Sequence, residues 1–155
     1  MTVLFMCPLL LAVFASAQHA ANDHGALVMG FDQEKTVHHF YLYDDGGAID
    51  VSVKDATDTK NLAAIRSHLP HIAMMFEGGD FDAPMLVHDT QNVPGTSALA
   101  KMKDRVSYTY ITTPNGGRVN IATTDEAART AIHDFLRYQI REHHTGDPMT
   151  VSPRR

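Results

Sequence analysis

The chain contains a single cysteine, Cys7, which lies in an apolar leader. Without that leader no cysteine remains, which excludes disulfide bonds and thiol chemistry. Basic residues are also scarce: 13 Lys and Arg stand against 18 Asp and Glu, the formal net charge is −5, and no basic run is longer than Arg154–Arg155. This charge distribution gives no electrostatic footprint for nucleic acid or for an anionic membrane surface.

The leader, residues 1–17, is apolar and ends in Ala15-Ser16-Ala17, which fits the small-x-small rule for signal peptidase. We expect it to be a signal peptide, and the mature protein to be periplasmic or secreted. The leader is too short for a persistent membrane helix, which needs about 20 apolar residues, so no membrane span is expected after cleavage. The rest is long enough for one domain, at residues 18–147, followed by a flexible tail at 148–155.

A strand–turn–strand–helix pattern follows the leader. Residues 38–43 and 48–53 are β-rich and flank Asp44-Asp45-Gly46-Gly47, which predicts a hairpin. Apolar residues then recur at helical spacing and predict a helix over residues 58–77, ended by Gly78-Gly79. The first part of the domain is therefore a ββα unit.

The same pattern returns in the second half of the chain. Strands are predicted at 106–111 and 118–123, around Pro114-Asn115-Gly116-Gly117, with a helix over 126–144. A lone hairpin is marginally stable, so two ββα units should share one core. The sequence predicts an α+β fold, a four-stranded, mainly antiparallel sheet with two helices on one face. The internal repeats span about residues 38–80 and 106–147.

Alignment of the two repeats shows a change at the predicted core face of the helices. Gln139 and His143 stand where the first helix has Ile72 and Phe76. A buried polar group without a partner costs about 1–3 kcal/mol. These two side chains are therefore expected to meet a protein group, a ligand or water.

The chain is rich in histidine, with 10 residues, and imidazole both titrates near neutral pH and binds metals. Strand and helix periodicity direct several of these imidazoles into the layer between sheet and helices. A methionine thioether on the same helical flank favours Cu(I), while imidazole suits copper, zinc or haem iron. The predicted metal ligands are His38, His68, His88, His143 and Met75. The competing interpretation is that the histidines are satisfied core or rim residues and that Met75 is packing filler.

Several motifs resemble those of a family of small exported bacterial proteins, and the resemblance covers nearly all of the mature sequence. The motifs are the segment Met29–Phe40, Asp45-Gly46-Gly47, His68-Leu-Pro-His-Ile72, Gly79-Asp80-Phe81 and the segment His133–Gln139. The resemblance implies that His38, His68, His88, His133, Gln139 and His143 belong to the family's pattern. On that basis Gln139 and His133 are expected to contact a bound cofactor or to hold the imidazoles in one tautomer.

Members of this family often carry the name aspartate carbamoyltransferase. A catalytic chain of that enzyme is about twice as long and grips carbamoyl phosphate with a Ser-Thr-Arg-Thr-type loop at a helix N-terminus, which this chain lacks. That activity is therefore not expected.

Four functions remain open at this point. The first is an exported binding protein for a transition metal, copper before zinc, and the second is a haem or small-ligand module. The third is an acid/base enzyme in which His68 or His143 works with Asp80 or Glu142; no Gly-x-Ser-x-Gly nucleophile turn supports it. The fourth is a structural or protein-interaction domain without a ligand.

Overall fold

The computed structural model describes residues 29–154, so the predicted signal peptide lies outside the described residues. Four strands and four α-helices follow one another in it, with one short 3-10 helix, η1. In chain order they are β1 (Thr36–Tyr43), β2 (Gly46–Val53), α2 (Thr59–Glu77), α3 (Asp82–Val87), α4 (Thr96–Lys101), η1 (Lys103–Arg105), β3 (Ser107–Thr113), β4 (Gly116–Ala122) and α5 (Glu126–Glu142).

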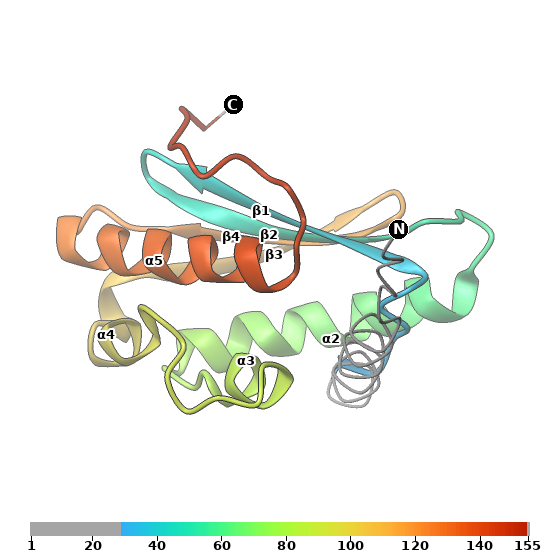
Figure 1. Cartoon of the computed structure of the whole chain (residues 1–155), viewed down its shortest axis with the longest axis horizontal. Helices are drawn as coiled ribbons and strands as arrows, with labels where there is room; N and C mark the ends of the chain where they lie inside the picture. The colour runs from blue at the N-terminus through green and yellow to red at the C-terminus, as the bar shows by residue number, and fades with distance from the viewer. Residues whose placement is uncertain (1–28, 155) are drawn as a thin grey trace, which may run out of the picture.

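The strands form one antiparallel sheet in the order β1-β2-β4-β3, and the helices lie on one of its faces (Figure 1). The predicted α+β fold with two ββα units is confirmed. Each long helix packs mainly on the hairpin of the other unit: α2 contacts β3 and β4, and α5 contacts β1 and β2. The two units are therefore interlocked, which explains physically why neither could bury its apolar face alone.

Both long helices begin directly after an aspartate that caps them. The side chain of Asp58 accepts a hydrogen bond from the Asn61 N–H (3.0 Å), and that of Asp125 accepts one from the Ala128 N–H (2.9 Å). These caps satisfy backbone donors that a helix cannot bond internally. Local chemistry therefore sets where both helices begin.

The turns differ from the prediction, because the glycine pairs lie inside the strands. The chain reverses at residues 44–45 and 114–115, and the glycines start β2 and β4. A Cβ atom at Gly116 would overlap the carbonyl oxygen of Val51, and one at Gly47 would overlap the Leu136 side chain. These positions lack side chains because another backbone or a helix approaches them closely.

The segment between the two units is mostly helical, since residues 82–87 form α3. The region that follows contains α4 and the η1 turn. The α3 helix matters for the site because its C-cap residue is His88.

The tail differs most from expectation: residues beyond 148, predicted to be flexible, run back along β1 as far as residue 154. The Ser152 N–H donates to the carbonyl of Leu42 (3.0 Å), and the carbonyl of Ser152 accepts from the Asp44 N–H (3.1 Å). Ser152 thus forms a parallel bridge with Tyr43. The tail covers this edge of the sheet.

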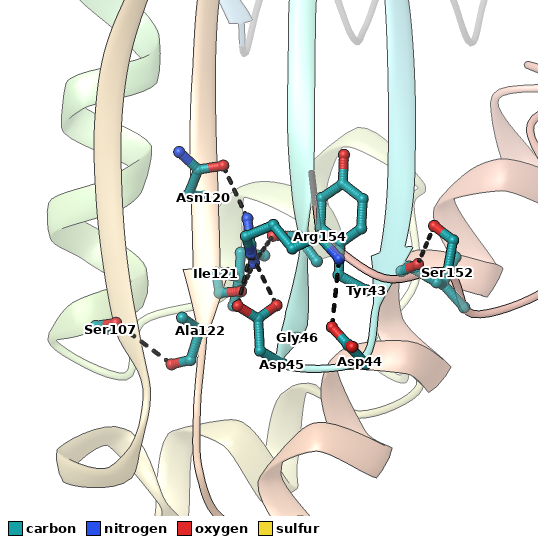
Figure 2. Close-up of polar contacts among 12 residues, drawn as sticks. Tyr43, Asp44, Asp45, Gly46, Ser107, Asn120, Ile121, Ala122, Ser152 and Arg154 are labelled. Atoms are coloured by element: carbon teal, nitrogen blue, oxygen red, sulfur yellow. Dashed lines mark hydrogen bonds and ion pairs between the residues drawn. The ribbon is translucent and has the colours of Figure 1, made fainter.

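Arg154 fixes the end of the tail (Figure 2). Its guanidinium donates to the Asp45 carboxylate (2.7 Å), to Asn120 Oδ1 (3.1 Å) and to the carbonyls of Gly47 (3.1 Å) and Ile121 (2.9 Å). It also lies 4.6 Å from the centre of the Tyr43 ring. One side chain therefore joins the β1–β2 turn to β4.

Replacement of Arg154 by alanine should lower the free energy of unfolding by about 2 kcal/mol, because it removes several charge-assisted hydrogen bonds that join the tail to the sheet. Urea denaturation at pH 7 followed by circular dichroism measures the change. Arg154→Lys should give an intermediate loss, since lysine keeps the charge but not the planar fork. Arg129→Ala on α5 is the matched control, and an equal loss in both alanine variants would contradict the role of Arg154.

Candidate functional site

A small cavity of about 70 Å³ lies between β1, β2, α2, α3 and α5. Most of its lining is apolar, contributed by side chains such as Phe40, Leu69 and Phe135. We call it the histidine cavity, because its polar lining residues are His38, His68, His88, Gln139 and His143. The structure thus brings together all four histidines that were predicted as metal ligands.

Three of the imidazoles are in direct contact. The ring of His38 on β1 stacks on that of His143, with centroids 5.1 Å apart and planes inclined by 21°. The ring of His88 lies edge-on to His143, with centroids 5.0 Å apart. The fourth imidazole, His68 on α2, is linked to His38 through Phe31, whose ring centre lies 5.8 Å from that of His38 and 5.6 Å from that of His68.

The alternation of β1 and the C-terminal ends of α3 and α5 determine where three of the imidazoles lie. His38 shares the helix-covered side of β1 with Phe40 and Leu42, as alternation requires. His143 and His88 are the C-cap residues of α5 and α3, where the chain leaves the helix. Three separate segments therefore deliver imidazoles to one point.

The hydrogen bonds of the cavity leave several polar atoms free. No ring nitrogen of His38, His68 or His143 is bonded to another group within residues 29–154. His88 Nε2 lies 3.0 Å from Gln139 Oε1 and donates to it, which leaves the lone pair of His88 on Nδ1. The amide nitrogen Nε2 of Gln139 is buried without a partner in the described structure. Buried polar groups are normally paired, so Gln139 Nε2 is a donor available to a ligand in the cavity.

Burial keeps the imidazoles of His38, His68 and His143 neutral. Loss of solvation lowers the pKa of His38 to about 4, with smaller effects from nearby His68 and His39. Burial likewise lowers the pKa of His68 to about 4, and His71 lowers it further. The pKa of His143 falls to about 3, mainly through burial and then through its neighbouring histidines. Neutral imidazole is the form that ligates metals, so no proton has to be displaced at pH 7.

Among residues 29–154, no charged side chain of either sign lines the cavity. Asp80 and Glu142, the expected acidic partners of an acid/base enzyme, are outside the lining, and Glu142 is exposed. A carboxylate that could orient a catalytic imidazole is therefore missing from the cavity wall.

Two predicted site residues lie elsewhere. His133 on α5 is buried, and its Nε2 lies 2.9 Å from the carbonyl oxygen of Tyr43 and 3.0 Å from that of Gly46. Its N–H therefore ties α5 to the β1–β2 turn, outside the cavity lining. Met75 on α2 packs partly buried against the core and does not line the cavity.

Two cavity residues, Met29 and Phe31, were not predicted. Both are buried and line the cavity from the segment that precedes β1. The thioether at this site is therefore that of Met29 in place of Met75. The only local indication in the sequence was that two apolar residues flank Gly30. In the structure Gly30 has a φ of 74°, in the left-handed region that favours glycine.

A carboxylate outside the cavity holds two of its walls together. Asp147, which follows α5, accepts hydrogen bonds from the Phe40 N–H (2.9 Å) and the Thr145 hydroxyl (2.7 Å), and its Oδ1 lies 2.9 Å from His39 Nδ1. These contacts fasten the segment after His143 to the strand that carries His38. The stacked rings of His38 and His143 belong to the two segments that this attachment joins.

Among residues 29–154, no three side chains of His, Cys, Asp or Glu are arranged, as they stand, to hold a metal ion. No helix in the same part of the chain is long and apolar enough to cross a membrane. Comparison of the sequence and structure with protein-family models, curated proteins and solved structures gave no match.

Proposed function

We propose that the chain is a binding protein for a transition-metal ion, copper before zinc, and that the histidine cavity is its site. The observation that carries this proposal is the contact of three imidazoles, His38, His88 and His143, with centroid separations of 5.0–5.1 Å around His143. The ring nitrogens of His38 and His143 lack partners among the described residues, and both rings are neutral at pH 7. Rotation of these rings out of their stack would turn nitrogen lone pairs toward an ion.

The size of the cavity favours an ion over an organic cofactor. Pockets for drug-sized ligands have volumes of about 300–1,000 Å³, whereas this one has about 70 Å³. A haem is therefore poorly supported. A metal ion with one small additional ligand fits the available space.

The uncharged lining favours Cu(I) over Zn(II). The cost of burying an ion in an apolar site rises with the square of its charge, so a divalent ion costs about four times as much as a monovalent one. No carboxylate from the described part of the chain lines the cavity to offset that charge. Imidazole and thioether donors suit Cu(I), and Met29 supplies a thioether in the lining.

The same lining argues against carbamoyl phosphate as a ligand, since no Lys or Arg side chain is among the cavity residues that the structure describes. A dianionic phosphate group needs cationic partners or a helix N-terminus. We therefore do not extend the carbamoyltransferase name of the resembling family to this chain. The proposed location, periplasmic or secreted, rests on the sequence of residues 1–17.

Titration of metal-free protein with Cu(I), in competition with a chromogenic chelator at pH 7, tests the proposal. We expect one equivalent to bind with a Kd of about 1 μM or tighter, and more tightly than Zn(II). Exchange of one ligand histidine in His38→Gln or His143→Gln should weaken Cu(I) binding by about 10–100-fold, a loss of about 1.4–2.7 kcal/mol. His71→Gln, which changes an exposed histidine one turn from His68, should bind like the wild type. Equal affinity in the double variant His38→Gln/His143→Gln would overturn the proposal.

A second candidate is a small neutral molecule with a hydrogen-bond acceptor, because the buried Gln139 Nε2 has a proton to donate and no protein acceptor within the described chain. Native mass spectrometry of the purified protein would detect such a molecule. A bound organic mass that is absent from Gln139→Leu, together with failure of the Cu(I) titration, would favour this candidate.

A further inference from the structure

The two edges of the sheet are protected unequally. The C-terminal half of the β1 edge is covered, because the Phe40 N–H donates to Asp147 and the Leu42 carbonyl accepts from Ser152. At the other edge, within the described residues, no backbone hydrogen bond reaches the outer side of β3 between Tyr108 and Thr112. Exposed edges invite pairing with another strand unless charge, proline or a bulge prevents it.

The strand register shows which backbone groups are free. In an antiparallel sheet successive residues direct their N–H and C=O groups alternately to the two neighbouring strands. Phe40 and Leu42 point outward from β1, and the register through β2 and β4 then places the outward groups of β3 on Tyr108, Tyr110 and Thr112. Each of these residues presents one free N–H and one free C=O.

We propose that two copies of the chain pair antiparallel along β3 and form a dimer with a continuous sheet. If the twofold axis passes through the Tyr110 pair, Tyr108 of each copy lies opposite Thr112 of the other, and every outward group of these residues is bonded. Thr109 then lies opposite Ile111 of the second copy on the open face of the sheet. Such cross-strand pairs of β-branched residues are favourable.

The composition of the strand indicates a second copy as its occupant. β3 reads Ser-Tyr-Thr-Tyr-Ile-Thr-Thr and contains no charge, proline or glycine, so self-pairing places no like charges opposite one another. Ile111, which is 43% exposed, would be covered. Pairing of β3 with β3 about a twofold axis uses the same edge in both copies, and the tail covers the C-terminal half of the β1 edge, so the assembly closes as a dimer instead of growing into a fibre.

Sedimentation velocity of the full chain tests this proposal at about 100 μM protomer, since dimer formation depends on concentration. We expect a dimer for the wild type and a monomer for Thr109→Lys/Ile111→Lys, in which lysines face one another across the axis. Thr130→Lys, an exposed substitution on α5, adds positive charge and should remain dimeric.

A second variant separates loss of pairing from loss of folding. Thr112→Pro removes one outward N–H and keeps the bonds to β4, as prolines at sheet edges do. It should be folded by circular dichroism and monomeric by sedimentation. A monomeric wild type at about 100 μM, or a dimer that survives both the lysine and the proline variants, would overturn the proposal.

Discussion

Acidification from pH 7 to pH 4 should strongly destabilise the metal-free protein. Histidine in an unfolded chain has a pKa near 6.5, whereas His38 and His143 titrate at about 4 and about 3 in the folded state. Below pH 6.5 the unfolded chain therefore binds more protons than the folded one, and stability falls as the pH falls. At pH 4, His38 alone lowers the free energy of unfolding by about 3 kcal/mol. With a similar loss at His143, the total is about 6 kcal/mol, which exceeds the whole stability of a marginal domain, about 5 kcal/mol.

Urea denaturation at pH 7, 6, 5 and 4, followed by far-ultraviolet circular dichroism, measures this loss. The pH range over which stability is lost identifies the groups responsible. The carboxylates that cap α2 and α5, Asp58 and Asp125, have lowered pKa values because they accept hydrogen bonds, so their contribution disappears only as the pH falls below about 4. His71→Gln should follow the wild-type curve. Constant stability between pH 6.5 and 4.5 would contradict the buried neutral imidazoles.

The fold was predictable because the information for it is local and occurs twice. Apolar periodicity predicted the bounds of α2 and α5 to within two residues. The interlocking of the two units was not predictable, since both helices present an apolar stripe and nothing local says which hairpin each one covers. The docked tail was missed for the same reason: Arg154 meets Asp45, a turn residue 109 positions earlier.

For the candidate site, the sequence predicted which way the side chains face but not which groups they contact. Periodicity decides which side a residue faces, so His38, His68, Gln139 and His143 were correctly directed into the layer between sheet and helices. Periodicity does not decide what a side chain meets there. His133 faces inward like the others, yet its N–H donates to two backbone carbonyls of the β1–β2 turn. Every residue type has such a carbonyl, so the sequence does not show which ones need a side-chain donor.

Exchange of His143 for phenylalanine should stabilise the metal-free protein and abolish metal binding. Phenylalanine is the residue of the corresponding helix position, Phe76, which is 2% exposed in the apolar core. At His143 the phenyl ring would lie against Phe40, whose ring centre is 5.4 Å from that of the imidazole, and the adjoining cavity offers space for the larger side chain. We expect a gain of about 1 kcal/mol at pH 7 from the added apolar burial. At pH 4 the gain should rise by about 3 kcal/mol, because the variant has no imidazole to titrate there.

This result would separate a binding site from a structural histidine. If His143 only filled the core, its replacement would cost stability or leave it unchanged, as most substitutions do. A site kept open for a ligand instead holds polar groups that the metal-free fold does not need, so their removal stabilises the fold and destroys function. Urea denaturation and Cu(I) competition on the same samples measure both effects, and His71→Phe on the surface of α2 should change neither. A less stable His143→Phe that still binds Cu(I) would show that the imidazole supports the fold and does not bind the metal.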